Sequence, residues 1–244
     1  MCTVTFLPQV DGQFLLTSNR DEAPHRSPQN ISTDQVNNQQ LAFPRDEEAG
    51  GTWIVIANSD RLVCILNGAF HKHHRQPPYR RSRGLMALDF FTYPNFEAFT
   101  GQYLFDGMEP FTMIVYEQNN LFELRWDETK AHVLKLDHKK PHIWSSATLY
   151  TPEVKDKRKA WFEDWLQQQQ GVYQRDTILD FHRNAGDGDP WNDVVMNRNN
   201  IVRTVSITSI QKGRSNMSMQ YIDLVNNGFK EHKIELKGEM VRSR

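Results

Sequence analysis

The chain opens on Met1-Cys2-Thr3-Val4-Thr5-Phe6-Leu7-Pro8, and Asn19-Arg20-Asp21-Glu22 follows after one further apolar run. If Met1 is removed, Cys2 carries a thiol and a free α-amine on one residue. The ordinary pKa of such an amine is about 8 and that of a thiol about 8.5, so the amine is able to accept the thiol proton at neutral pH. This pattern predicts a nucleophile with its own general base. The alternative is that Cys2 is a small buried hydrophobic residue.

A predicted hairpin links the two stretches. Thr3–Leu7 and Gln13–Ser18 have the composition of β-strands, and they flank Asp11-Gly12, a hairpin turn signal. Because the end of a hairpin returns beside its start, the residues after the second strand are predicted to lie near the cysteine. Arg20 would then lower the pKa of its thiol, and Asp21 would hold the α-amine. The alternative is a solvated charge cluster at a strand end.

Composition narrows the class of protein. The chain has 244 residues with a net charge of −1, and no linker-like segment divides it, so one domain over residues 1–244 is expected. The charge argues against nucleic-acid binding. Cys2 and Cys64 form no disulfide framework, which favours a reducing compartment. No leader-like segment and no apolar run of roughly 18 residues is present. The sequence thus predicts a soluble, cytoplasmic protein without an integral membrane segment.

The predicted elements indicate an α+β fold. Further strands are expected at Thr52–Ala57, Arg61–Leu66, Phe111–Glu117, Leu121–Trp126, Ala131–Leu136, Thr204–Ile210, Ser218–Leu224 and His232–Leu236. Helices are expected at Ser82–Tyr93, Pro94–Gln102, Pro152–Gln169 and Asp176–Arg183. Runs of antiparallel strands that alternate with pairs of helices favour two sheets packed face to face with helices outside.

The most basic segment, 71–83, follows Asn67 directly. Its cationic residues are Lys72, Arg75, Arg80, Arg81 and Arg83. If the segment overhangs a pocket, it favours an anionic ligand that carries carboxylates or phosphates. The alternative is a mobile solvated loop, which Pro77-Pro78 supports.

Several other side chains are candidates for ligand binding. His71, His73 and His74 are able to ligate a metal or haem, but no cysteine or carboxylate stands at a matching spacing, and no metal site is predicted. Trp53 comes after Gly50-Gly51-Thr52 and would either form the floor of a pocket or belong to the core. The candidate ligand-binding residues are Asn19, Trp53, His71, His73, His74 and Arg83.

The motifs together resemble the NRDE family, whose eukaryotic members are called transport and Golgi organisation protein 2. The matching stretches are Met1-Cys2, Asn19–Glu22, Gly50–Trp53, Leu66-Asn67, Ser82–Gly84, Asp89-Phe90, Ser145–Pro152 and Thr204-Val205. The family is in turn similar to the cysteine N-terminal-nucleophile (Ntn) hydrolases, which include bile-salt hydrolases and penicillin V acylases. The resemblance implies a four-layered αββα sandwich with mainly antiparallel sheets.

The resemblance also implies a set of catalytic residues. Cys2 would be the nucleophile, with Arg20 and Asp21 at the end of the second strand. Asn67 would donate to an oxyanion, and Arg203 would be the late arginine of the site. Related sequences tend to carry Ser-Asn where this chain has Ser145-Ser146. Ser146 has a shorter reach and one donor in place of two, which weakens the case for turnover.

Two functions remain open. In the first, a ligand-handling protein holds a small amphipathic or anionic ligand between the sheets; the resemblance implies haem trafficking or acyl and lipid homeostasis, with haem as a carried ligand. In the second, a cysteine Ntn hydrolase cleaves a linear C–N amide or a thioester with Cys2 as nucleophile. A fold shared with enzymes does not decide between them.

Overall fold

The computed structural model describes residues 3–237, in which two antiparallel sheets contain all the paired strands. The first sheet has the order β10 (His142–Ser145), β1 (Thr3–Pro8), β2 (Phe14–Glu22), β12 (Val202–Lys212), β13 (Asn216–Asp223) and β14 (Gly228–Glu235), with β11 (Asn197–Arg198) paired to β12. The second has the order β3 (Ile31–Val36), β4 (Gln39–Pro44), β5 (Ile54–Ala57), β6 (Arg61–Asn67), β7 (Phe111–Glu117), β8 (Asn120–Trp126) and β9 (Ala131–Leu136).

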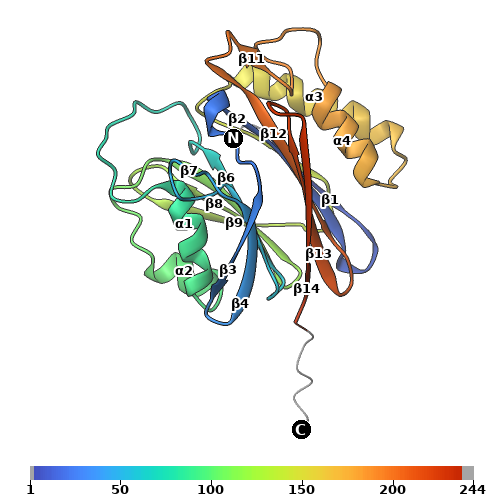
Figure 1. Cartoon of the computed structure of the whole chain (residues 1–244). Coiled ribbons are helices and arrows are strands. Elements are labelled where there is room, and N and C mark those ends of the chain that lie inside the picture. The colour runs from blue at the N-terminus through green and yellow to red at the C-terminus, as the bar shows by residue number, and fades with distance from the viewer. Residues whose placement is uncertain (1–2, 238–244) are drawn as a thin grey trace.

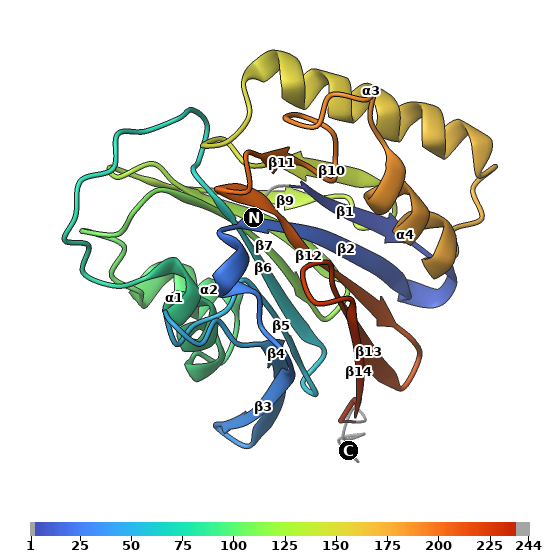
Figure 2. The ribbon, with the colours of Figure 1, turned by 45° about the horizontal axis from the view of Figure 1, so that its top comes forward.

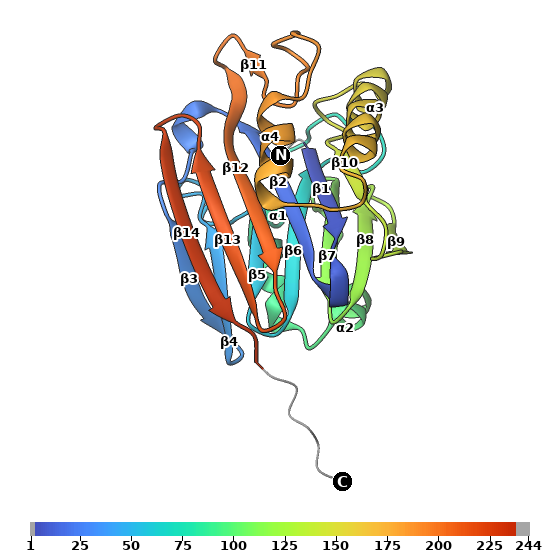
Figure 3. The same cartoon turned by 90° about the vertical axis from the view of Figure 1, so that its right-hand side faces the viewer.

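The two sheets pack face to face (Figures 1 and 3). Alternation along β1 shows how the sequence produces this layer. Val4 and Phe6 point into the apolar cluster between the sheets, whereas Leu7 belongs to a second cluster on the opposite face. Successive side chains of a strand point to opposite faces, so a strand with apolar residues in both sets is covered on both sides.

Helices cover the two outer faces. Helices α3 (Pro152–Gln168) and α4 (Arg175–Asn184) lie on the first sheet, and α1 (Arg83–Asp89) and α2 (Phe96–Gln102) lie on the second (Figure 2). The Oγ of Ser82 accepts a hydrogen bond from the backbone N–H of Leu85 and caps α1. The layers are therefore helix, sheet, sheet and helix. The expected α+β class and αββα sandwich with antiparallel sheets are confirmed.

Some predicted boundaries differ from the structure. The helix expected over Ser82–Tyr93 ends at Asp89 and continues as a 3₁₀ turn, Phe90–Thr92. Strands β3, β4 and β10 were not predicted. No residue of β3 is buried, since it lies at the edge of its sheet, and it lacks the apolar alternation that marks a half-buried strand.

Within residues 3–237, no helix is long and apolar enough to cross a membrane.

Candidate functional site

The start of β1 brings several predicted site residues together. Thr3 pairs with Asn19 of β2 on one side and with Ser145 of β10 on the other. Arg20 and Asp21 follow Asn19 directly, so three strand ends meet here. Cys2, the predicted nucleophile, is bonded to Thr3 but lies outside the described residues.

Asn67 and Ser146 are in contact near the start of β1. Asn67 ends β6 of the second sheet, and Ser146 follows β10 of the first sheet. The Oγ of Ser146 donates to the Asn67 carbonyl oxygen at 2.9 Å, and the backbone N–H of Ala147 donates to the same oxygen at 3.2 Å. Ser146 is fully buried. These bonds tie the end of β6 to the segment after β10, so Ser146 fixes the backbone at Asn67.

The Asp21 carboxylate is buried between two hydroxyl donors. The Tyr150 hydroxyl donates to one oxygen at 2.7 Å, and the Thr204 hydroxyl donates to the other at 2.6 Å. Asp21 is 3% exposed. A carboxylate held in this way has a fixed orientation beside the first residue of β1.

Arg20 points away from Asp21 into a pocket. Its guanidinium donates to Oδ2 of Asp46 at 2.5 Å and to the Arg26 carbonyl oxygen, and it lies 4.4 Å from the centre of the Trp53 indole. Burial lowers the pKa of Arg20, while the Asp46 and Glu22 carboxylates raise it. The structure thus places Arg20 in the pocket wall, and its effect on the Cys2 thiol stays a prediction.

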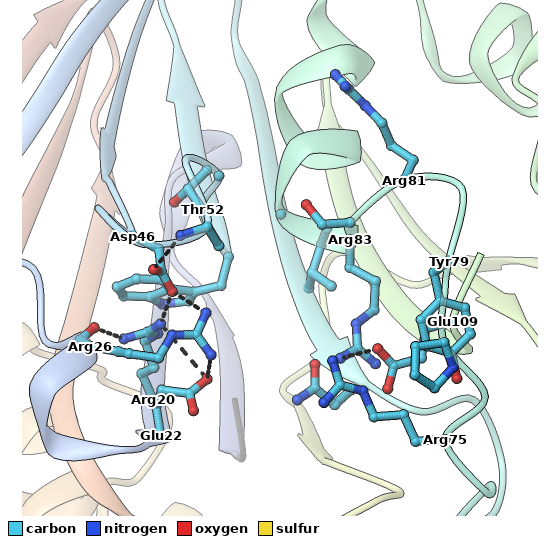
Figure 4. Close-up of a pocket in the computed structure, with 18 residues that line it drawn as sticks. Arg20, Glu22, Arg26, Asp46, Thr52, Arg75, Tyr79, Arg81, Arg83 and Glu109 are labelled. Atoms are coloured by element: carbon cyan, nitrogen blue, oxygen red, sulfur yellow. Dashed lines mark hydrogen bonds and ion pairs between the residues drawn. The ribbon is translucent and has the colours of Figure 1, made fainter. Parts of the chain in front are cut away.

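The pocket has a volume of about 380 Å³. Its charged lining residues are Arg20, Arg26, Arg75, Arg81, Arg83, Glu22, Asp46 and Glu109. Figure 4 shows them as two facing groups, with Arg20, Arg26 and Asp46 on one side and Arg83 and Glu109 on the other. Five guanidinium groups against three carboxylates make the lining residues net positive, while Asp89 and Glu48 outside the lining pair with Arg81 and Arg26.

The second wall comes from the basic loop and α1. Arg83 pairs with Glu109 at 3.0 Å, and Arg81 forms a two-pronged pair with Asp89 at 2.8 and 2.5 Å. Arg75 is exposed and forms no hydrogen bond or ion pair within residues 3–237. Several residues of the basic segment 71–83 therefore line the pocket, which agrees with the prediction that this segment overhangs one.

Trp53 combines burial with a free donor. Trp53 is 5% exposed and also lines the pocket. It is therefore both a core residue and part of the pocket wall. Its Nε1–H has no hydrogen-bond partner among the residues that the structure describes. A buried donor without a partner is costly, and a ligand oxygen would satisfy it.

Four other predicted site residues lie outside this pocket. His71 and His74 are exposed, while Nε2 of His73 lies 3.2 Å from a Glu109 carboxylate oxygen. Arg203 lies within β12, opposite Glu22 of β2. None of the four belongs to the pocket lining.

Asn19 also lies away from the pocket. Its side-chain amide donates to the carbonyl oxygens of His182 at 3.0 Å and Val194 at 2.9 Å, and it contacts Nδ1 of His182. Nε2 of His182 lies 2.8 Å from the Thr5 hydroxyl. Asn19 thus fastens α4 to the first sheet.

His182 should make the stability of the protein depend on pH. Burial, helped by the charge of Arg158, lowers the pKa of His182 to about 3 from an ordinary 6.5. Between these values the unfolded chain binds a proton that the folded protein does not, so stability is lost as the pH falls below about 6.5. From pH 7.5 to 5.0 the wild type should lose about 2 kcal/mol more than His182→Gln. Urea unfolding at both pH values measures this difference, and equal losses in the two proteins would refute it.

Two glycines allow the pocket walls to meet. A Cβ on Gly51 would lie 2.5 Å from the carbonyl carbon of Gly84, and the backbone N–H of Thr52 donates to the Gly84 carbonyl oxygen at 3.1 Å. The segment before β5 therefore crosses the first turn of α1 in backbone contact. The expectation that the glycine pair permits close approach to another segment is confirmed.

Gly51→Ala should lower the free energy of unfolding by about 1–3 kcal/mol, because the added methyl group forces the two backbones apart. The matched control is Gly101→Ala in α2, where a Cβ meets nothing within 4 Å. The control should be stabilised by about 0.5–1 kcal/mol, since alanine favours the helix. Equal effects of the two substitutions in urea unfolding would contradict the close crossing.

The sequence of the chain matches one protein family over most of its length. The family model described as transport and Golgi organisation 2 matches residues 1–223. The chain belongs to this family. No curated protein sequence matches it.

Solved structures similar to this transport and Golgi organisation 2 chain share its architecture. Two variants of conjugated bile acid hydrolase from Clostridium perfringens are 11% and 10% identical, with TM-scores of 0.53 and 0.54. The matches cover 98% and 99% of this chain and 100% of each variant. The Caenorhabditis elegans N-acylethanolamine-hydrolyzing acid amidase ortholog is 12% identical with a TM-score of 0.57, covering 86% of this chain and 92% of that one. The fold is therefore of the Ntn-hydrolase type.

The pocket of this family member includes residues that sequence reasoning missed. Asp46, Arg26 and Glu109 supply most of its ion pairs. Asp46 stands in an acidic run with Glu47 and Glu48, which is typical of a solvated loop. Its 4% exposure depends on Arg20 and Arg26, so no local signal marks it.

Proposed function

We propose that the protein binds a small amphipathic anion in the arginine pocket beside the start of β1. The observation that supports this most is the lining of five arginines against three carboxylates. Guanidinium groups bind carboxylates and phosphates through paired hydrogen bonds. Arg75 forms no ion pair within residues 3–237, so its guanidinium is available to an anion.

The lining also supports an apolar portion in the ligand. Between the charged groups lie Trp53, Ile65, Pro77 and Tyr79. Amphipathic ligands are held by apolar walls with a few polar groups that fix their orientation. Haem, with its carboxylates, and an acyl-coenzyme A, with several phosphates, both have this character.

Acyl-coenzyme A is the ligand class that we favour. Its separate phosphates match guanidinium groups that are spread over two walls. Haem would draw less support from the histidines, because His71, His73 and His74 are not pocket residues and His73 lies against Glu109. We therefore assign the protein to the handling of acyl-thioester metabolites, with haem trafficking as the competing role.

Calorimetric titration with three probes tests this proposal. Lauroyl-coenzyme A should bind with one-to-one stoichiometry and an affinity that falls as salt rises, since exposed charges are screened. Laurate, with one carboxylate, should bind more weakly. A haem complex with a Soret band that changes on replacement of His71, His73 or His74 would favour haem instead. Failure of all three probes to bind would refute anion binding at this pocket.

A second candidate function is hydrolysis by Cys2. Buried Asp21, the Asn67–Ser146 contact and the Thr3 pairing at the start of β1 favour it. In this proposal the Cys2 thiolate attacks the carbonyl carbon of an amide or thioester, and the α-amine takes the thiol proton. That proton passes to the departing amine or thiol as the C–N or C–S bond breaks. Water then cleaves the acyl-enzyme and regenerates the thiol.

The test of hydrolysis begins with the intact mass of protein produced without an N-terminal tag. Loss of Met1, followed by turnover of an amide or thioester that disappears in Cys2→Ala, is the expected result. Retention of Met1 would remove the α-amine as base and contradict this second function. Retention of Met1 would have no bearing on the first proposal, that the arginine pocket binds an anion.

A further inference from the structure

A second, smaller pocket lies between α3, β10 and the end of β8, which are side by side in Figure 3. Its volume is about 180 Å³, and its apolar lining residues are Leu66, Ile143 and Trp144. We name it the α3 pocket. Pockets that enclose a whole drug-sized ligand are larger, roughly 300–1,000 Å³. The α3 pocket therefore has room for a small chemical group.

The segment 67–70 separates the α3 pocket from the arginine pocket. Asn67 lines the arginine pocket. The carbonyl oxygens of the next three residues instead accept hydrogen bonds from side chains that line the α3 pocket, namely Thr112, Arg125 and Lys155. The two pockets share this wall, and no residue of the described chain lines both. Binding at the α3 pocket is therefore separate from binding at the arginine pocket.

The Lys155 ammonium group has no counter-charge in direct contact. Within residues 3–237 it forms no ion pair, and the hydrogen bond that it donates to the Phe70 carbonyl oxygen is long, at 3.5 Å. Burial and the positive charge of Arg125 lower the pKa of Lys155 and outweigh the opposing effect of Asp156. Arg125 itself is paired with Glu123, at 2.7 and 3.0 Å. Lys155 is therefore the cation of this pocket that gains most from a bound anion.

Two further donors line the same pocket. Lys159 follows Lys155 by four residues, so both side chains leave the same face of α3. Nζ of Lys159 lies 3.7 Å from Glu163, in a pair whose side chains are 65% and 56% exposed, and such surface pairs contribute little. The Ser145 hydroxyl of β10 forms no hydrogen bond with another residue of the range 3–237. Two ammonium groups and one hydroxyl are thus available to a ligand.

We propose that the α3 pocket binds a phosphate group through Lys155, Lys159 and Ser145. A phosphate monoester carries a charge of about −1.5 to −2 at pH 7 and three strong acceptor oxygens, which match two ammonium groups and a hydroxyl. Lysine binds phosphate as a point charge and needs no fixed fork geometry. Asp156 also lines the pocket and opposes an anion, but it is exposed, so salt screens its charge. This site does not rest on the function proposed for the arginine pocket.

Titration with inorganic phosphate, followed by proton–nitrogen correlation NMR of the backbone amides, tests the proposal. Sodium chloride holds the ionic strength constant, so general screening does not change during the titration. The amide signals of Ser145 and Lys155 should shift along a saturating curve. Shifts that do not saturate, or that chloride alone reproduces, would overturn the proposal.

Lys155→Gln should weaken phosphate binding, measured at the Ser145 signal, by about tenfold, as expected for loss of one charged hydrogen bond. Lys157→Gln is the matched control. It removes the same charge from the same helix, at a residue that is 57% exposed, pairs with Asp187 and does not line the pocket. Its affinity should stay within about twofold of the wild type. Equal losses in the two variants would mean that phosphate responds only to the overall charge of α3, which would overturn the proposal.

Coenzyme A distinguishes a free phosphate ion from a phosphate carried by a larger ligand. The titration uses Arg75→Glu, which impairs the arginine pocket and leaves the α3 pocket intact. Shifts of the Ser145 and Lys155 signals at lower concentrations of coenzyme A than of inorganic phosphate support a carried phosphate, and shifts with inorganic phosphate alone support the free ion. If neither probe moves these signals, the α3 site is refuted, while anion binding at the arginine pocket keeps its own test.

Discussion

Replacement of Asp46 by alanine is expected to lower the free energy of unfolding by about 3–5 kcal/mol, the range found when one partner of a buried ion pair is removed. Oδ2 of Asp46 accepts from Arg20 at 2.5 Å and from Arg26 at 2.6 Å. The side chains of Arg20 and Asp46 are 5% and 6% exposed. Without Asp46, the buried Arg20 guanidinium would lose its closest counter-charge.

Glu48→Ala is the matched control for this prediction. Its side chain is 67% exposed and lies 3.5 Å from Nε of Arg26. A surface pair of this kind contributes about 0–1 kcal/mol. Urea unfolding of both variants measures the contrast, and a loss in Asp46→Ala no larger than in the control would show that the Arg20–Asp46 pair does not hold the pocket wall.

Arg75→Glu is expected to weaken the binding of lauroyl-coenzyme A by about 10- to 100-fold, because a charged hydrogen bond contributes about 1.5–3 kcal/mol and the new carboxylate also repels the ligand. Arg75 is the choice because it is exposed and lines the pocket. Replacing it should disturb the fold little, so a loss of affinity reports on the ligand.

Lys72→Glu makes the same change of charge on the same loop, at an exposed residue that does not line the pocket. Its affinity should stay within about twofold of the wild type, since screening weakens distant surface charges. Calorimetric titration at one ionic strength compares the two variants. Equal losses would mean that the loop acts only through its overall charge.

The sequence predicted the parts of the fold that depend on local patterns. The strands expected at Thr3–Leu7 and Gln13–Ser18 correspond to β1 and β2, which pair as a hairpin with Thr3 opposite Asn19. Arg20 and Asp21 therefore follow the strand pairing at the start of β1. The alternation of apolar residues and the hairpin geometry were sufficient for this result.

Side-chain directions and distant partners could not be predicted in the same way. Asn19 and Arg20 are neighbours, yet Asn19 contacts His182 of α4 whereas Arg20 contacts Asp46 in the pocket. Arg158 appeared only as a polar residue of a predicted helix, and its contact with Thr3 joins residues that are 155 positions apart. Such contacts depend on how the layers pack, which no local signal encodes.

A crystal structure of the protein with lauroyl-coenzyme A would decide whether the arginine pocket binds an amphipathic anion. We expect phosphate oxygens within hydrogen-bond distance of Arg75, Arg81 or Arg83. A ligand bound instead in the pocket lined by Phe6, Phe14 and Tyr173, with the arginine pocket free of it, would contradict the claim.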